Sequence, residues 1–163
     1  MGNILFFMGG SASGKSTTVK ALSNELRSKN YNCVVIDADD LSKCQIMPRH
    51  GDFSLEARLE RGPQLVKIVN WLQPQFDYIL IAATGQPLEV REIFKQSFTN
   101  YKSFYLSVSL ELRKKRDHKE IYKLKNIPGK DLPYSEPVDC NHTIKAENLT
   151  ITEIVNIIKK IIL

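Results

Sequence analysis

Residues 9–16 read Gly-Gly-Ser-Ala-Ser-Gly-Lys-Ser, and this stretch decides the fold because it fits G-x-x-x-x-G-K-[ST], the pattern of a phosphate-binding P-loop. The apolar run at 4–8 just before it is typical of a buried strand, and the apolar spacing in 16–26 after it is typical of one helix face. The alternative, a chance Gly/Ser turn, does not explain why strand, spacing and helix occur together. The sequence therefore predicts a loop that binds the phosphates of a nucleotide.

The residues of this loop have distinct expected tasks. Glycines allow backbone N–H groups to curl around phosphate oxygens, and the N-terminus of the following helix adds a partial positive charge. Lys15 is expected to reach the β- and γ-phosphates, and Ser16 to place its hydroxyl on Mg²⁺. The predicted nucleotide contacts of the loop are Gly9, Gly10, Ser11, Ala12, Ser13, Gly14, Lys15, Ser16 and Thr17.

The composition is that of an ordinary globular protein with one domain. The 163 residues suffice for a proper core, and the hydrophobic and charged fractions are 42% and 25%. No apolar run approaches the length of a membrane span, and the first one has five residues and no basic leader. The three cysteines are odd in number and lack metal-type spacing. We therefore expect a cytoplasmic protein with reduced thiols and no membrane partner.

A cluster of basic residues supplies much of the formal net charge of +5. Its members are Arg113, Lys114, Lys115, Arg116, Lys119, Lys123, Lys125 and Lys130. The cluster is either a solvated helix face or a cationic flap over a polyphosphate, as small-molecule kinases need. A nucleic-acid surface ranks last, because no aromatic interleaving and no known nucleic-acid module accompany the charges. We expect no nucleic acid partner.

Apolar runs typical of strands alternate with helical patterns along the chain. The expected strands are 4–8, 33–36, 78–83, 104–108 and 143–145, and the expected helices after the first are 55–72, 88–98, 110–124 and 151–162. Ser109 is a candidate cap of the 110–124 helix, and Thr150 with Glu153 forms a capping-box pattern before the last one. This alternation predicts an α/β fold in which helices cover both faces of a parallel sheet and ligands bind at the carboxyl ends of the strands.

Three carboxylates, Asp37, Asp39 and Asp40, follow the second expected strand directly. At that strand end they would face the same crevice as the P-loop. One could take a proton from an attacking hydroxyl, and another could hold Mg²⁺ through water. The alternative is a cluster at a helix start, since aspartate is a common N-cap. We take Asp37 and Asp39 as candidate catalytic residues and Ser16 and Asp39 as candidate Mg²⁺ ligands.

Further motifs resemble those of the adenylyl-sulfate (APS) kinase family over nearly the whole chain. The family's Asp-Gly-Asp is similar to residues 37–39, and its Gly-Phe-Ser…Asp-Arg-x-Glu is similar to 52–54 and 57–60. Its Arg-Asp-x-Lys-x-x-Tyr-Lys resembles 116–123, and its Gly-x-Asp-x-Pro-Tyr-x-x-Pro resembles 129–137. These last two motifs are far more specific than a P-loop. The resemblance implies a P-loop nucleoside-triphosphate kinase fold in a single domain, 1–163, with a short lid at about 113–137.

The resemblance also implies a reaction, in which the γ-phosphoryl of MgATP passes to the 3′-hydroxyl of adenylyl sulfate. Lys15 would serve ATP, and Asp39 with Asp37 would orient or deprotonate the acceptor hydroxyl. Phe53 would stack on the acceptor base and Arg58 would bind its phosphate–sulfate group, although a loop-anchoring Phe53 and a surface ion pair for Arg58 remain alternatives. Lid residues that would close over the phosphates are Arg116, Lys119 and Lys125, of which both lysines could equally be solvated.

The chain departs from the family pattern on the acceptor side. Ser42 stands where the family has an arginine, the stretch Ala83-Thr84-Gly85-Gln86 lacks another, and Arg61 replaces an asparagine. Serine or glutamine cannot replace the charge of an arginine fork. A less charged or differently shaped acceptor therefore becomes plausible, with Thr84, Gln86 and Arg61 as further acceptor contacts. One example is cytidine diphosphoramidate, whose phosphoramidate offers N–H donors where a sulfate offers only acceptors. A nucleotide-binding regulator without turnover is the non-enzyme alternative, and the frequent dimers among relatives leave a homodimer open.

Overall fold

The computed structural model describes residues 1–49 and 51–163, and its centre is a parallel five-stranded sheet in the order β2-β3-β1-β4-β5. The strands are β1 (Asn3–Met8), β2 (Cys33–Asp37), β3 (Tyr78–Ala82), β4 (Tyr101–Ser107) and β5 (His142–Lys145). β1 is the central strand, and Phe7 is paired with Ala82 of β3 and Phe104 of β4. All the strands therefore end at the same edge, where the P-loop follows β1.

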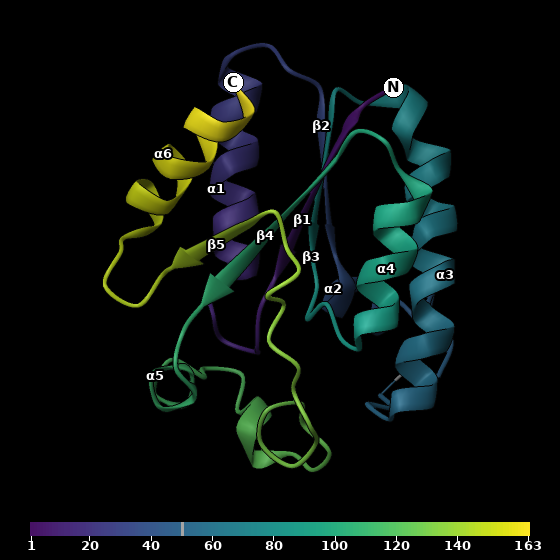
Figure 1. Cartoon of the computed structure of the whole chain (residues 1–163), viewed down its shortest axis with the longest axis vertical. Coiled ribbons are helices and arrows are strands. Elements are labelled where there is room, and N and C mark those ends of the chain that lie inside the picture. The colour runs from purple at the N-terminus through teal and green to yellow at the C-terminus, as the bar shows by residue number, and fades with distance from the viewer. Residues whose placement is uncertain (50) are drawn as a thin grey trace.

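Helices cover both faces of this sheet, as the sequence predicts (Figure 1). α1 (Lys15–Ser28) and α6 (Ile151–Ile162) pack on one face around Leu22 and Ile158. α3 (Leu55–Leu72) and α4 (Leu88–Ser97) pack on the other face around Val69 and Phe94. Both faces of the sheet are buried, which explains why its strands read as continuous apolar runs.

Local capping sets several helix starts. Ser109 accepts a hydrogen bond from the backbone N–H of Leu112, and Thr150 and Glu153 form the expected capping box. Asp37 caps a short helix that the sequence analysis left as an alternative, α2 (Ala38–Lys43). The aspartate cluster is thus both a helix start and the end of β2.

The expected helix over 110–124 is wrong. α5 (Leu110–Lys115) ends early, and a 3₁₀ turn, η2 (Ile121–Lys123), follows after a break. The Asp117 carboxylate accepts the backbone N–H of Tyr122 at 2.7 Å, and Glu120 adopts a left-handed φ of 55°. The lid segment, which we define as residues 113–137, is otherwise irregular and lies beyond the carboxyl edge of the sheet (Figure 1).

A second 3₁₀ turn, η1 (Gln73–Gln75), follows α3. Trp71 falls within the expected 55–72 helix and is 70% exposed near the end of α3. Within 1–49 and 51–163, none of the helices has the length and apolar character required to span a bilayer. Cys33, Cys44 and Cys140 are free thiols.

Candidate active site

The P-loop joins β1 to α1, and its backbone adopts φ angles that are rare for residues with a side chain. Gly9 and Gly14 have φ angles of 150° and 94°, and Ala12 adopts a left-handed φ of 62°. Such strain in a non-glycine residue persists where the surrounding structure over-determines it, and it clusters at ligand sites. The Lys15 ammonium folds back on the loop and donates to the Gly10 carbonyl at 2.8 Å. The strained backbone and the Lys15 contact thus mark this loop as a candidate ligand site.

The charge state of Lys15 is set by its surroundings. Burial lowers the pKa of Lys15 from 10.5 to about 8, the carboxylates of Asp39 and Asp37 act to raise it, and the cations Arg113 and Lys119 lower it further. Burial disfavours the charged ammonium because the ammonium loses water. An anionic phosphate at this position would restore the charge. Lys15 is thus suited to bind an anion more tightly than an exposed lysine would.

Ser16, Asp37 and Asp39 form the oxygen-rich part of the site. One carboxylate oxygen of the buried Asp37 accepts the Ser16 hydroxyl at 2.5 Å, and the other accepts the backbone N–H of Asp39 at 3.0 Å. The Asp39 side chain is 63% exposed and lies 4.0 Å from the Lys119 ammonium. A hydroxyl and carboxylates are the hard ligands that Mg²⁺ takes together with waters and substrate phosphates, so these residues fit that ion. Asp37, rather than Asp39, is the partner of Ser16.

A cavity of about 490 Å³ opens above the P-loop and extends toward α6 and the lid segment. The predicted nucleotide contacts that line it are Ser11, Ala12, Gly14, Lys15, Ser16, Thr17 and Arg116. Gly9, Gly10 and Ser13 are buried within the loop. The positive end of α1 and Lys15 face this nucleotide-side cavity, which suits a polyphosphate.

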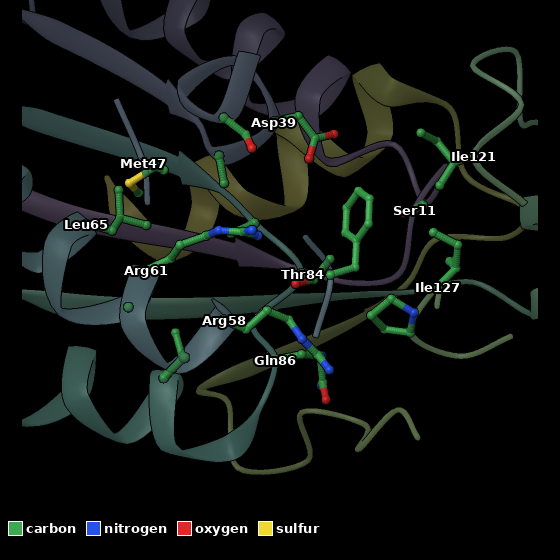
Figure 2. A pocket seen from close by; sticks show the side chains of 18 of the residues that line it. Ser11, Asp39, Met47, Arg58, Arg61, Leu65, Thr84, Gln86, Ile121 and Ile127 are labelled. Carbon is green, nitrogen blue, oxygen red and sulfur yellow. The ribbon is translucent and has the colours of Figure 1, made fainter. Parts of the chain in front are cut away.

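A second cavity of about 260 Å³ adjoins the first on the side of α3. Figure 2 shows Arg58 and Arg61 of α3 reaching into it, with Ile121 and Ile127 of the lid segment on the opposite side. The two cavities share a wall formed by Ser11, Asp39, Ala83, Thr84, Lys119 and Ile121. A group bound in this acceptor-side cavity would therefore meet the end of a polyphosphate beside Asp39.

Phe53 and Arg58 both line the acceptor-side cavity, where the sequence places acceptor contacts. Phe53 precedes Ser54, which caps α3 by accepting the backbone N–H of Ala57 at 3.2 Å. Arg58 is one turn into α3, and its Nε donates to the Ser54 carbonyl at 3.3 Å. Partial burial, together with the nearby charge of Arg61, lowers the pKa of Arg58. The remaining donors of Arg58 point into the cavity (Figure 2).

Arg61 lines the same cavity, but its guanidinium already has partners. Nε donates to the Pro48 carbonyl at 3.0 Å, and Nη2 donates to the carbonyls of Arg49 and Asp52. Arg61 therefore fastens the segment before Phe53 to α3. The sequence shows that residue 61 is basic. It does not show that the donors of its guanidinium are engaged by carbonyl groups distant in the sequence.

Thr84 and Gln86 follow β3 and line the acceptor-side cavity. The Gln86 amide, however, donates to the Ser135 carbonyl and accepts the Ser135 N–H at 3.1 Å. It thus ties the lid segment to the sheet. Nearby, the buried Arg91 donates to the Gly85 carbonyl at 2.8 Å and pairs with Asp139 at 2.7 Å. The loop carrying Thr84 is accordingly held from both sides.

The three predicted lid cations occupy different places. Lys119 lines both cavities, and Arg116 lines the nucleotide-side cavity while donating to the Glu147 carbonyl at 3.0 Å. Lys125 is exposed and is absent from the described residues that line either cavity. Lys43 of α2 lines the acceptor-side cavity although the sequence analysis did not propose it. Arg113, a member of the predicted basic cluster, is only 7% exposed.

Comparison with known proteins agrees with this geometry. The family model for adenylylsulphate kinase matches residues 1–145. An adenylyl-sulfate kinase of Oceanobacillus iheyensis is 32% identical over 171 residues, which cover 95% of this chain and 81% of that protein. The cytidine diphosphoramidate kinase of Campylobacter jejuni is 23% identical over 140 residues, which cover 82% and 81%.

Solved structures share the fold. An APS kinase of Mycobacterium tuberculosis in complex with AMPPNP and APS superposes with a TM-score of 0.85 at 22% identity, covering 99% of this chain and 97% of that one. Shikimate kinase from Acinetobacter baumannii in complex with shikimate reaches 0.68 at 17% identity, covering 99% and 93%. The predicted P-loop kinase fold is thereby confirmed.

Proposed function

Because the chain belongs to the adenylylsulphate kinase family and is an ATP-dependent kinase, we propose that it transfers the γ-phosphoryl group of MgATP to a ribose hydroxyl of a small nucleotide. The observation that carries the proposal is the shared wall of the two cavities, in which Asp39 faces both. Phosphoryl transfer requires little covalent work from the protein beyond positioning and electrostatic stabilisation. Two adjoining cavities with one carboxylate between them meet that requirement.

On the nucleotide side, Lys15 and the N-terminus of α1 would hold the β- and γ-phosphates. Ser16 and Asp37 would hold Mg²⁺, which supplies charge neutralisation at those phosphates when bound. Lys119 and Arg116 approach the same cavity from the lid segment. They would add positive charge near the transferred group.

On the acceptor side, Asp39 would receive the proton of the attacking ribose hydroxyl. The acceptor oxygen forms a bond to the γ-phosphorus, the bond from that phosphorus to the β–γ bridging oxygen breaks, and ADP leaves. Phe53 would stack on the acceptor base, and Arg58 would pair with its anionic end. This division gives Asp37 to the metal side and Asp39 to the acceptor side.

The simplest acceptor is adenylyl sulfate. The alternative, cytidine diphosphoramidate, is favoured by two residues of the acceptor-side cavity that offer no free guanidinium. Ser42 is uncharged, and Arg61 is engaged by carbonyl groups. An acceptor end that carries N–H donors in addition to acceptor oxygens needs fewer donors from the protein than a sulfate does.

A coupled ATP-consumption assay with Mg²⁺ tests the proposal, with adenylyl sulfate and cytidine diphosphoramidate offered side by side. Mass spectrometry of the product would verify a gain of one phosphoryl group on the nucleotide. If adenylyl sulfate at micromolar concentration is turned over at a rate comparable to that of the cytidine compound, the alternative is ruled out. ATP binding without transfer to any nucleotide would contradict the proposed function and favour a regulator.

A further inference from the structure

Arg113 is a buried cation that the proposed reaction does not use. It is 7% exposed near the end of α5, and its Nε donates to the Val108 carbonyl at 3.1 Å. Its guanidinium carbon lies 5.7 Å from the ring centre of Tyr122 and 5.9 Å from that of Tyr134. Within the described part of the chain, no carboxylate forms an ion pair with it. Burying a charge in this way costs free energy of folding, so we ask what its contacts contribute.

The guanidinium lies directly against the P-loop. A Cβ added to Gly10 would stand 1.8 Å from Nη1 of Arg113, so only glycine permits this approach. Nη1 also donates to the Tyr122 hydroxyl, which in turn donates to the Ser11 carbonyl at 2.8 Å. The neighbouring Gly10 carbonyl is the acceptor of the Lys15 ammonium. Arg113 thus contacts, directly and through Tyr122, the part of the P-loop whose carbonyl group accepts a hydrogen bond from Lys15.

The same guanidinium holds two parts of the lid segment. Tyr122 belongs to η2, beside Ile121, which lines both cavities. Tyr134 packs on Gly129, where an added Cβ would lie 3.4 Å from the Tyr134 Cβ and 3.7 Å from Arg113 Nη2. Arg113 lies within 6 Å of both aromatic rings, the range in which a cation is attracted to the ring face. Lid segment and P-loop therefore meet at one buried side chain.

We propose that Arg113 is a positioning residue that fastens the lid segment to the P-loop through Tyr122 and Tyr134. With this link, the walls of both cavities and the Lys15 ammonium keep one mutual arrangement when nucleotide binds. Without it, the lid segment would have to be ordered at the cost of nucleotide affinity. The kinetic part of this inference rests on the proposed function, whereas the mechanical part requires only nucleotide binding.

The test compares Arg113→Met and Arg113→Lys with Glu111→Gln, a control that removes an exposed charge from the same helix but no trypsin site. Trypsin cleavage after Arg116, Lys119, Lys123, Lys125 or Lys130 of the lid segment reports how firmly that segment is held. We expect cleavage of Arg113→Met about tenfold faster, with AMPPNP protecting less than in the wild type. The control should match the wild type.

Kinetics supply a readout that simple loss of packing would not move. In Arg113→Met the KM for ATP should rise much more than kcat at saturating ATP falls, because bound ATP itself orders the lid segment and the cost of that ordering is paid in affinity. Arg113→Lys keeps the charge, but its lid segment should remain easier to cleave because an ammonium lacks the planar fork. The KM for ATP should rise about tenfold in Arg113→Met.

A lower melting temperature with unchanged cleavage and an unchanged KM for ATP would overturn the proposal. If Arg113→Met does not fold, Tyr122→Phe removes only the hydroxyl between Arg113 and Ser11. It should speed cleavage and raise the KM for ATP about threefold, and no change in either would equally refute the link. Cleavage and AMPPNP protection need no acceptor, so they would support the link even if no nucleotide were phosphorylated.

Discussion

Replacing Arg61 should weaken acceptor binding although its guanidinium need not touch the acceptor. The side chain donates to the carbonyls of Pro48, Arg49 and Asp52 and so holds the segment that leads to Phe53. Hydrogen bonds from a charged donor contribute about 1.5 kcal/mol or more each, but this segment is partly solvated and water would replace some of them. A net loss of about 2 kcal/mol, or about 30-fold in the KM for the acceptor, follows for Arg61→Gln.

The assay is steady-state turnover at saturating MgATP with the acceptor varied, for Arg61→Gln, Arg61→Lys and the control Lys67→Gln, an exposed charge on the same helix. We expect Arg61→Lys to recover little, because one ammonium cannot span three carbonyl groups. The KM for ATP should stay unchanged. Near-complete recovery by lysine would mean that Arg61 binds an anionic group of the acceptor directly, and the reasoning from carbonyl contacts would be refuted.

Four shorter predictions concern the phosphate loop, the acceptor carboxylate, pH and stability. Lys15→Ala should reduce turnover at least about a thousandfold with the circular dichroism spectrum intact, and unchanged turnover would refute the P-loop assignment. Asp39→Asn should lower kcat far more than ATP affinity; if affinity falls instead, Asp39 is a metal ligand. Since burial holds the pKa of Lys15 near 8 and phosphate needs its charged form, ATP affinity measured by calorimetry should fall above pH 8, and a flat profile to pH 9.5 would contradict this. Asp139→Asn leaves the buried Arg91 without its carboxylate, so the free energy of unfolding measured in urea should fall by about 2 kcal/mol. An unchanged free energy of unfolding would mean that the pair behaves as a solvated one.

The P-loop, the sheet and most helices could be predicted because their signals are local. Apolar runs mark β1 and β3, and the pattern at Thr150 and Glu153 marks the start of α6 within four residues. The 110–124 helix was wrong because a side-chain contact, from Asp117 to the Tyr122 N–H, outweighs helical spacing. Trp71 likewise fits a helical face by spacing, yet its position near the end of α3 leaves it in solvent.

The roles of several charged and polar residues could not be predicted because their partners are distant in sequence. Residue type and order placed Arg61 and Gln86 at the acceptor-side cavity, but only the fold shows that Pro48 and Ser135 occupy their donors. Arg113 stood in a run of basic residues and had no pattern that distinguished a buried member from exposed ones.

These engaged side chains bear on acceptor selectivity. An anionic group entering the acceptor-side cavity finds Arg58 and the exposed Lys43 and Lys119, while Lys119 lies 4.0 Å from Asp39. A cation that is already engaged by other groups of the protein cannot pair with the acceptor. The apolar side chains of the lining, which include Met47, Leu65 and Ile127, cannot replace such a cation. Affinity should therefore come mainly from base stacking and the contact with Arg58. An acceptor whose far end also carries N–H donors loses little in such a cavity, whereas an end that can only accept hydrogen bonds loses more.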